Sequence, residues 1–198
     1  MTDAGASLLD ASVEALFERS GALLDGHFLL KSGRHAGRYL EKFLVLQHPS
    51  IGVELCRRFA EVLAPLAPTL VVGPTTGGVL LSFETARQLG GSARAAFAEP
   101  VSGGGRSLRR GWPVAPDERV VLVDDILTTG ASLAETVEAV RAAGVEPMAA
   151  AVIADRSTAP VEVGVPVHAL GRFDVPSWEP ADCPLCADGV GLRKPGSS

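Results

Sequence analysis

The spacing of hydrophobic residues changes near residue 70. Upstream of it, apolar side chains recur at helical intervals in residues 11–19 and again after Pro49, where Ser50 is the expected cap of a helix. Between these two segments, short apolar runs in Phe28–Phe43 surround two glycines and predict extended strands joined by a turn. The apolar stripe expected to face the core in the second helix consists of Ile51, Leu55, Phe59, Val62 and Leu63.

Downstream of residue 70 the apolar runs become short and continuous. The runs LVVG, ARAAF, VVLV and AAAVI are separated by helical stretches or loops, and VPVHAL adds a further apolar run. Such runs are typical of strands that are covered on both faces, so the pattern predicts an α/β fold with a central parallel sheet. Helices are expected over Val79–Leu89 and Leu133–Ala143, the second opened by a capping box of Ser132 and Glu135.

One segment, Glu99–Arg119, breaks this alternation. It contains four glycines, three prolines and four arginines, and its apolar residues show no core periodicity. A loop of this length inside a compact domain is usually a functional lid, and a solvent-exposed β-hairpin with basic tips is the alternative. No internal repeat or long linker divides the rest, so the chain of 198 residues is expected to form one domain.

Composition and charge narrow the classes of protein that the chain can represent. Hydrophobic residues make up 46% of the sequence and the formal net charge is −5, which suits a globular protein and argues against general nucleic-acid binding. No apolar run reaches the roughly 18 residues that a membrane helix needs, and the N-terminus lacks the basic and apolar regions of a signal peptide. Three cysteines, with only two closely spaced, do not form a secreted disulfide framework. We therefore expect a cytoplasmic protein without nucleic-acid or membrane partners.

The segment VVLVDDILTTGAS, residues 120–132, carries the strongest chemical signal. It places Asp124 and Asp125 at the end of a buried strand, followed by hydroxyls and a glycine at the start of a helix. In an open α/β sheet, ligands bind beyond the carboxyl ends of the strands, where helix N-termini favour phosphate. A sugar phosphate fits both the acidic pair and the loop. Its vicinal hydroxyls would contact the carboxylates, and its phosphate would lie on the loop. Direct Mg²⁺ binding by the two acids and a purely capping role are the alternatives.

This segment resembles the phosphoribosyl-pyrophosphate (PRPP) signature of the type I phosphoribosyltransferases. The resemblance implies that the two acids contact the ribose hydroxyls of PRPP and that the loop after them holds the 5′-phosphate. The stretch VVGPTTGGVLL stands where the family has its pyrophosphate-binding loop. The residues that the resemblance implies in PRPP binding are Lys31, Thr75, Thr76, Gly77, Gly78, Asp124, Asp125, Ile126, Leu127, Thr128, Thr129, Gly130, Ala131 and Ser132.

Two further stretches resemble the orotate phosphoribosyltransferases within that family. FLLKSGRHAGRYLEKF is similar to the strand-and-turn segment of the hood that covers the base, and IADRS to the position where an arginine meets the carboxylate of orotate. The resemblance implies that Lys31, Thr128 and Arg156 contact orotate. It also implies a hood from about residues 1–48 and 171–198, a core of about residues 49–170 and a mobile lid over residues 99–119. The implied reaction transfers the phosphoribosyl group of PRPP to orotate, with Mg²⁺ bound through PRPP near Asp124.

The match departs from the family at two basic positions. The family's lid commonly carries lysines and a histidine, whereas this lid has neither, and the pyrophosphate turn often has a lysine where Gly77 stands. Arg106, Arg109 and Arg110 are therefore expected to supply the catalytic charge of the lid, beside the two acids. In the family the lid reaches a neighbouring subunit, which implies a homodimer. An enzyme for another base, such as a purine, and a non-catalytic PRPP-binding regulator are the alternatives.

The stretch DCPLCADG near the C-terminus has no obvious place in the family pattern. Cys183 and Cys186 form a C-x₂-C that would be half of a zinc site, with His168, Asp182 or a second subunit supplying further ligands. A redox pair and a tight turn with two buried thiols are the alternatives. A C-x₂-C is a weak zinc signal without its second half.

Overall fold

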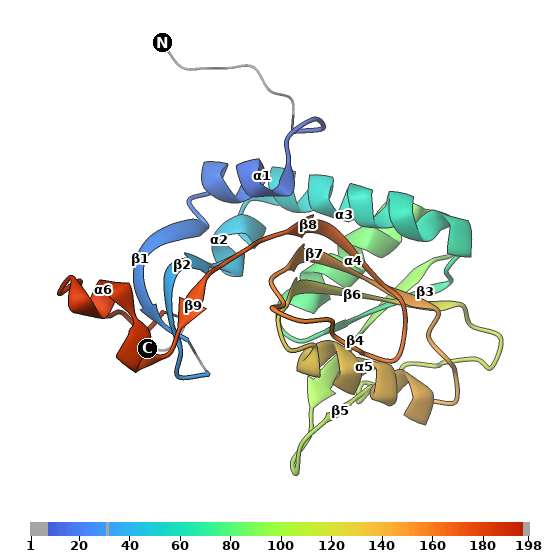
Figure 1. Ribbon diagram of the computed structural model, residues 1–198. Coiled ribbons are helices and arrows are strands. Elements are labelled where there is room, and N and C mark those ends of the chain that lie inside the picture. Colours follow the sequence, from blue (N-terminus) through green and yellow to red (C-terminus); the bar gives the residue numbers. More distant parts are fainter. Residues whose placement is uncertain (1–7, 31, 196–198) are drawn as a thin grey trace.

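Two separate sheets organise the computed structural model, which describes residues 8–30 and 32–195 (Figure 1). The larger sheet has six strands in the order β5-β4-β3-β6-β7-β8. Its strands run parallel, except that the short edge strand β5 is antiparallel to β4. The strands are β3 (Leu70–Pro74), β4 (Arg94–Pro100), β5 (Arg106–Ser107), β6 (Val120–Leu127), β7 (Ala149–Asp155) and β8 (Val167–Arg172). The predicted α/β fold with a central, mostly parallel sheet is confirmed.

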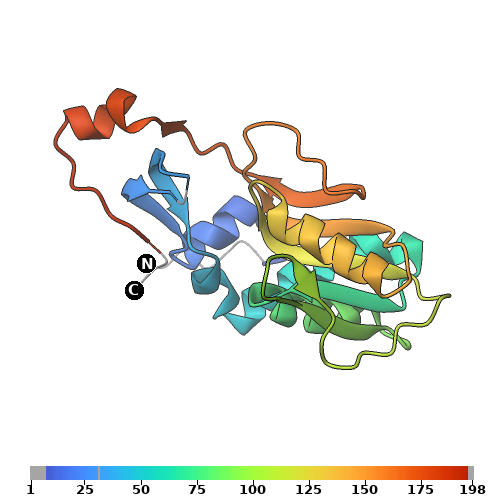
Figure 2. The same cartoon turned by 90° about the horizontal axis from the view of Figure 1, so that it is seen from below.

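Helices cover both faces of the larger sheet. One face is covered by α1, α3 and α4, and the other by α5 (Figures 1 and 2). The apolar strand residues therefore divide between two hydrophobic clusters, so that Val121 belongs to one and its neighbour Leu122 to the other. Within the described residues, no helix is apolar over a stretch long enough to cross a membrane. The helices are α1 (Val13–Arg19), α3 (Pro49–Leu63), the 3₁₀ turn η1 (Ala64–Leu66), α4 (Gly77–Leu89) and α5 (Ala131–Ala142).

A smaller sheet is built from both ends of the chain. β1 (Leu23–Leu29) pairs with β2 (His35–Leu40), and β2 pairs with the two-residue strand β9 (Ser177–Trp178). The chain then continues through η2 (Pro180–Asp182) and α6 (Pro184–Ala187) and returns beside β1, where the backbone N–H of Leu29 donates to Arg193 at 2.8 Å. We call the small sheet and the C-terminal arm of residues 179–195 the hood (Figure 1).

The starts of three helices differ from the sequence prediction. Helix α3 begins at Pro49 with His48 in the cap position, so Ser50 is not the cap. Proline suits the first helical position because the N–H that it lacks has no acceptor there. Helix α4 begins at Gly77, two residues earlier than expected. Helix α5 begins at Ala131 after Gly130, without a side-chain cap, so the capping box is wrong.

The apolar stripe of α3 follows an interval of four residues. Ile51, Leu55, Phe59 and Leu63 are buried as predicted, whereas Val62 is 39% exposed. At about 100° per residue, Val62 lies between Ile51 and Leu55 on the helical wheel, so its direction does not account for its exposure. Val62 is the second-last residue of the helix, and the buried stripe ends with Leu63.

The segment predicted as a lid starts as a β-hairpin. β4 and β5 pair through Glu99 with Ser107 and through Pro100 with Arg106. Three consecutive glycines with positive φ, residues 103–105, lie in the connection. Further along, Leu108, Trp112 and Val114 pack against the hydrophobic cluster beneath α5. The hairpin interpretation therefore holds for the first part of the segment, with glycines at the tip where basic residues were expected.

Candidate active site

Three loops meet at the carboxyl edge of the larger sheet. They follow β3, β6 and β7, which are adjacent and parallel. From β3 the chain moves to β4 on one side, whereas β6 lies on the other side, so the connections diverge between β3 and β6. Such a switch point forms the crevice in which open α/β sheets bind ligands. The predicted PRPP residues 75–78 and 124–132 lie at this edge, and Lys31 lies outside the described residues.

Asp124 and Asp125 are almost fully buried near the end of β6, with 8% and 4% of their surfaces exposed. Asp124 Oδ1 accepts the N–H of Asp125, and Asp125 Oδ1 accepts the N–H of Ile126, both at 2.8 Å. Burial, reinforced by the charge of Asp125, raises the pKa of Asp124 to about 7. The pair therefore favours ligands that donate hydrogen bonds or carry positive charge, because these stabilise the ionised carboxylates.

Lys42 is a site residue that the sequence reasoning missed. It is the first residue of the short helix α2 (Lys42–Leu46), which follows the hood strand β2. Its Nζ donates to Asp125 Oδ1 at 3.0 Å and lies 2.8 Å from Oδ2. The angle of the contact with Oδ2 is unsuitable for a hydrogen bond. This buried oxygen therefore has no hydrogen-bond donor among the described residues. No local spacing signals the ion pair, because its two residues are 83 positions apart.

The loop after β6 depends on glycine at position 130. Gly130 has a φ of 76° and caps the N-terminus of α5. An added Cβ would overlap Val161 and would lie 2.8 Å from Val163 Cγ1, so both conformation and space require glycine. The first N–H groups of α5 have no acceptor within the helix, and the helix dipole adds positive potential there. Together with the hydroxyls of Thr128 and Thr129, this end of the helix is suited to bind phosphate.

The turn between β3 and α4 is packed so closely that its three glycines, Gly73, Gly77 and Gly78, exclude a side chain at their positions. A Cβ on Gly73 would overlap the carbonyl of Gly78, and a Cβ on Gly78 would lie 2.8 Å from the carbonyl carbon of Gly73. A Cβ on Gly77 would overlap Asp125 Oδ2. A lysine at position 77, as the family often has, would therefore displace the acidic pair from its present position. Backbone groups are left to contact a ligand at this turn.

Arg106 of β5 bridges the two anion-binding turns. Its Nη1 lies within hydrogen-bond distance of Thr75 O at 3.3 Å and of Ala98 O at 3.2 Å. Its Nη2 contacts Ser132 Oγ at 3.5 Å, and its Nε lies 3.3 Å from Glu135 Oε2. The side chain is only 10% exposed. This guanidinium therefore places positive charge between the loops that follow β3 and β6.

The other two predicted lid arginines lie elsewhere. Arg110 donates to both carboxylate oxygens of Glu99, at 2.9 and 2.6 Å, and is 62% exposed. The hydrogen bond from Arg110, with the charges of Arg110 and Arg109, holds the pKa of Glu99 below its usual range. Arg109 is exposed as well. Of the three arginines, Arg106 is the one that reaches the convergent loops.

Arg156 follows β7 and faces a cavity of about 300 Å³. The cavity is lined by Arg156, Ser157, Thr158, Arg172, Phe173, Asp174 and Val175. Burial lowers the pKa of the Arg156 guanidinium, and the nearby Tyr39 hydroxyl partly offsets this effect. No acidic side chain among the described residues pairs with Arg156, whereas Arg172 lies 3.1 Å from Asp155 Oδ2. Arg156 is therefore a partly buried cation that is available to an anionic ligand.

Arg34, directly before β2, is turned toward the C-terminal arm. Its guanidinium forms an ion pair with Glu179 and donates to Ser177 Oγ at 3.0 Å and to Ser177 O at 2.6 Å. These contacts link the turn after β1 to β9. Arg34 therefore holds the hood together in this structure.

Comparisons with known proteins agree with this geometry. Residues 52–167 match the family model described as phosphoribosyl transferase domain. The chain is 45% identical over 185 residues to the orotate phosphoribosyltransferase of Pelotomaculum thermopropionicum, covering 93% of this chain and 96% of that protein. It is 40% identical to the Thermotoga maritima orotate phosphoribosyltransferase, covering 93% and 97%. Among solved structures, orotate phosphoribosyltransferase from Aeropyrum pernix matches with a TM-score of 0.63 and 26% identity, over 80% of this chain and 92% of that chain.

Proposed function

Because this chain belongs to the phosphoribosyltransferase family, we propose that it transfers the 5-phosphoribosyl group of PRPP to orotate. The products are orotidine 5′-monophosphate and pyrophosphate, in the synthesis of pyrimidine nucleotides. The resemblance that the sequence indicated is confirmed, as is the type I phosphoribosyltransferase fold. One arrangement carries the proposal. It is the buried Asp124–Asp125 pair between two anion-binding turns, with Arg156 on the loop after the next strand.

The ribose phosphate half of PRPP fits the end of β6. The carboxylates of Asp124 and Asp125 would accept hydrogen bonds from the vicinal ribose hydroxyls, which compensates the burial of their charge. The 5′-phosphate would lie on Thr128–Ser132, where backbone N–H groups and hydroxyls surround the N-terminus of α5. Ile126 and Leu127 contribute through the backbone that holds this loop, since Ile126 N–H donates to Asp125 and Leu127 O accepts from Arg156 N–H.

The pyrophosphate half fits the turn after β3. Orotate N1 would lose its proton and form a bond to C1 of the ribose while the bond from C1 to the pyrophosphate oxygen breaks. The electron pair of that bond leaves with pyrophosphate, which can take up the proton. Positive charge then develops on the ribose and negative charge on the leaving pyrophosphate, so the protein's task is to hold both substrates in line and to stabilise the leaving group. Backbone N–H groups of Thr76–Gly78 and the guanidinium of Arg106 would stabilise that negative charge. The N–H of Thr75, also expected to contact pyrophosphate, instead donates to Ala98 O at 3.0 Å.

Mg²⁺ is the cofactor that we propose, bound together with PRPP. The donor set suits a hard cation, because the buried Asp125 Oδ2 has no well-directed donor among the described residues and Asp124 lies beside it. When bound, Mg²⁺ would neutralise charge on the departing pyrophosphate. Asp124 would contact it directly or through water. Lys42 already shares the negative charge of Asp125, which reduces the repulsion between the two carboxylates.

Orotate is the proposed base because its carboxylate matches Arg156. A planar guanidinium binds a carboxylate bidentately, and Arg156 has no acidic partner among the described residues. A purine carries no carboxylate and would leave this partly buried cation unpaired, which disfavours the alternative of a purine enzyme. Thr128, and Lys31 outside the described residues, are the other proposed contacts to orotate.

We propose that the enzyme is a homodimer. Helix α4 exposes Leu80 and Phe83, 55% and 68% accessible, one turn apart on its surface, and Phe43 of α2 is 45% exposed. Apolar side chains grouped on packed helices are typical of a subunit interface. Light scattering coupled to size-exclusion chromatography would test this, and Phe83→Glu should shift the mass toward the monomer.

The cytoplasm is the proposed location. Among the described residues, Cys56, Cys183 and Cys186 are all free thiols, a state that reducing compartments maintain. A compartment-specific thiol label applied to intact cells would test the assignment, with labelling only after permeabilisation of the inner membrane as the expected result.

The experiment that tests the reaction combines the purified protein with PRPP, Mg²⁺ and orotate, and follows the loss of orotate absorbance. Adenine, hypoxanthine and uracil run in parallel, and orotate alone should be consumed. Arg156→Met should lower kcat/KM for orotate by about 100-fold with little change in PRPP affinity, whereas Arg141→Met on the surface of α5 should have no effect. Tight PRPP binding without turnover of any base would favour the non-catalytic regulator instead.

A further inference from the structure

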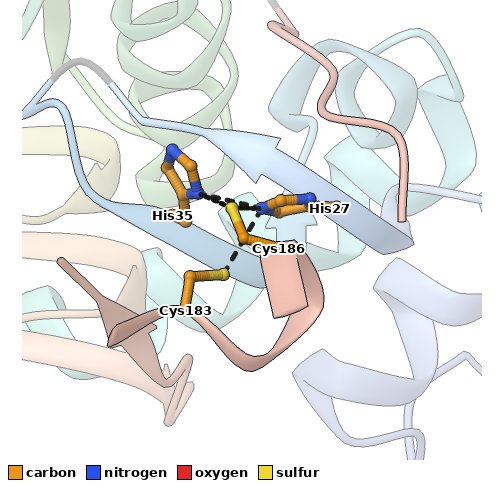
Figure 3. Close-up of side chains that lie close together, drawn as sticks. All are labelled: His27, His35, Cys183 and Cys186. Carbon is orange, nitrogen blue, oxygen red and sulfur yellow. Dashed lines mark hydrogen bonds between the residues drawn. The ribbon is translucent and has the colours of Figure 1, made fainter. Parts of the chain in front are cut away.

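Two histidines and two cysteines converge inside the hood (Figure 3). His27 comes from β1, His35 from β2, and Cys183 and Cys186 from the arm around α6. The first three are buried and Cys186 is exposed. One ring nitrogen of each histidine and both sulfur atoms lie within 4.8 Å of one another. The catalytic proposal uses none of these four residues.

An irregularity in β1 brings the two histidines to one face of the sheet. The register shifts between Asp25 and Phe28, after which Phe28 pairs with Ala36 and Leu29 pairs with His35. Paired residues share a face, and residues two apart on one strand share it as well. His27 therefore lies on the same side as Leu29 and His35. Without this bulge, a slip of one residue would turn His27 to the opposite face.

Three of the four short distances within the cluster fall in the range expected for the ligand shell of one metal ion, and the distance between the two histidine nitrogens is shorter. His27 Nε2 lies 2.9 Å from His35 Nδ1 and 3.4 Å from Cys183 Sγ. Cys186 Sγ lies 3.3 Å from His35 Nδ1 and 3.7 Å from His27 Nε2. Tetrahedral zinc, bound about 2.0–2.1 Å from nitrogen and about 2.3 Å from sulfur, separates its ligand atoms by roughly 3.3–3.8 Å. We propose that His27, His35, Cys183 and Cys186 form a structural zinc site that fastens the C-terminal arm to the hood strands.

The hydrogen bonding of His27 supports a lone pair directed at the cluster. His27 Nδ1 lies 2.8 Å from the carbonyl oxygen of Val190, a group that only accepts hydrogen bonds. Nδ1 therefore carries the proton, and in the neutral ring Nε2 is left with a lone pair that points toward the two sulfurs and His35. A backbone carbonyl that orients a histidine in this way is the usual outer partner of a metal-bound imidazole.

The donor set selects zinc over other common cations. Two thiolates and two neutral imidazoles balance the charge of a divalent ion, and this combination is typical of structural zinc. Mg²⁺ and Ca²⁺ prefer oxygen ligands, and no carboxylate belongs to the cluster. The expected further ligands were different. His168 is an exposed residue on β8 of the larger sheet, and Asp182 is not in the cluster, so the second half of the site comes from β1 and β2 of the same chain.

The site adds to a small set of contacts between the arm and the hood strands. These include the backbone hydrogen bonds of Leu29 and Arg193 and the ion pair of Arg34 with Glu179, while β9 is only two residues long. A metal that joins β1, β2 and the arm would restrain residues 32–34, because His35 lies directly after them. The zinc proposal does not depend on the proposed enzymatic reaction.

The test measures zinc bound to the purified full-length chain by elemental analysis, after loading with Zn²⁺ and desalting. About one zinc per chain is expected for the wild type, and little or none for Cys183→Ser or Cys186→Ser. Because Cys183 is buried and its variant could misfold, the exposed Cys186 provides the decisive variant. Cys56→Ser and His168→Gln are the matched controls and should keep the metal. Cys56 lies in the core, where burial raises the pKa of its thiol to about 12.

Substitution with Co²⁺ provides an independent reading of the ligands. The wild type should show the intense visible bands of tetrahedral Co²⁺ and a thiolate charge-transfer band, both weakened in Cys186→Ser. A chelator should lower the melting temperature of the wild type by several degrees and leave Cys186→Ser unchanged. Three results would overturn the proposal. They are a wild type without zinc after loading, variants that retain it, and an intact mass lower by two hydrogens, which identifies a disulfide between Cys183 and Cys186.

Discussion

The proposed catalytic edge of the large sheet and the proposed zinc cluster of the hood are encoded in opposite ways. At the edge, most of the predicted ligand contacts come from two continuous stretches, residues 75–78 and 124–132, each following a strand of the same sheet. In the hood, four side chains from three separate segments meet, and His27 and Cys183 are 156 positions apart. The first site relies largely on backbone N–H groups and helix ends. The second relies on side chains that a bulge and the path of the arm bring together.

This difference shows which kind of site a local motif can specify. A glycine-rich turn before a helix fixes its own backbone, so the anion site forms wherever the strand and the helix form. A four-ligand metal site depends on strand register, which a slip of one residue would destroy. Mutations at the two sites should therefore have separate effects. Those at the edge of the large sheet should reduce catalysis, and those in the hood cluster should reduce metal binding or the stability of the hood.

The largest effect is expected from Asp125→Asn. Loss of the charge weakens the hydrogen bonds to the ribose and the pairing with Lys42, and kcat/KM for PRPP should fall by about 100-fold to 1,000-fold. Zinc content should stay at the wild-type level. Steady-state kinetics and elemental analysis of the same preparation check both parts. Asp117→Asn, at an exposed acid of the lid segment, is the control, and a loss below about threefold in Asp125→Asn would contradict the ribose assignment.

A comparable but smaller effect is expected from Arg106→Ala. Removal of the guanidinium between Thr75 and Ser132 should lower kcat by about 100-fold, because it leaves the developing charge on pyrophosphate less stabilised. Arg109→Ala and Arg110→Ala should remain within about threefold of the wild type. Single-turnover kinetics separate the chemical step from product release. Equal losses for Arg106→Ala and Arg110→Ala would show that closure of the lid rearranges the contacts described above.

Gly130→Ala should destabilise the phosphate loop. The substitution adds a Cβ at positive φ and forces it against Val161 and Val163, at a cost of about 2–4 kcal/mol of unfolding free energy. Gly144→Ala is the matched control, because Gly144 also has a positive φ but no atom within 4 Å of an added Cβ. It should cost only about 1–2 kcal/mol. Urea denaturation gives both values, and equal losses would contradict the close packing at Gly130.

The narrowest effect is the pH dependence contributed by Asp124, because it is confined to one range of pH. Burial and the charge of Asp125 raise its pKa from about 4 in the unfolded chain to about 7 in the fold, although Lys42 and Arg106 lower it in part. Its stabilising contribution is therefore complete below about pH 4 and is lost as the pH rises through 7, by at most about 4 kcal/mol. Between pH 5 and 8, the stability of Asp124→Asn should fall less with pH than that of the wild type. Urea denaturation at a series of pH values gives the free energy of unfolding of both proteins. If the two profiles have the same slope, the pKa of Asp124 is not raised.

Long elements could be predicted from the sequence, and short ones could not. The five apolar runs after residue 69 all became strands. The central strands β3, β6 and β7 are buried almost throughout, which requires continuous apolar runs, whereas the edge strand β8 is largely exposed. The two-residue strands β5 and β9 and the short helices α2 and α6 have no periodicity to recognise. The two short strands form because β4 and β2 offer them hydrogen-bond partners. The misplaced caps of α3 and α5 have a related cause, since Pro49 and Gly130 satisfy the helix starts without a side-chain cap.

The sequence by itself determined the α/β fold, the acidic pair at the end of its strand and the two anion-binding turns. Each of these depends on residues that are neighbours along the chain, so local backbone preferences and burial suffice to specify them. Only the tertiary structure decided that Lys42 pairs with Asp125, that Arg106 and not Arg110 enters the site, and that His27 and His35 complete the set of Cys183 and Cys186. Those contacts join segments far apart in sequence. Their geometry follows from strand register and chain path, which no local spacing records.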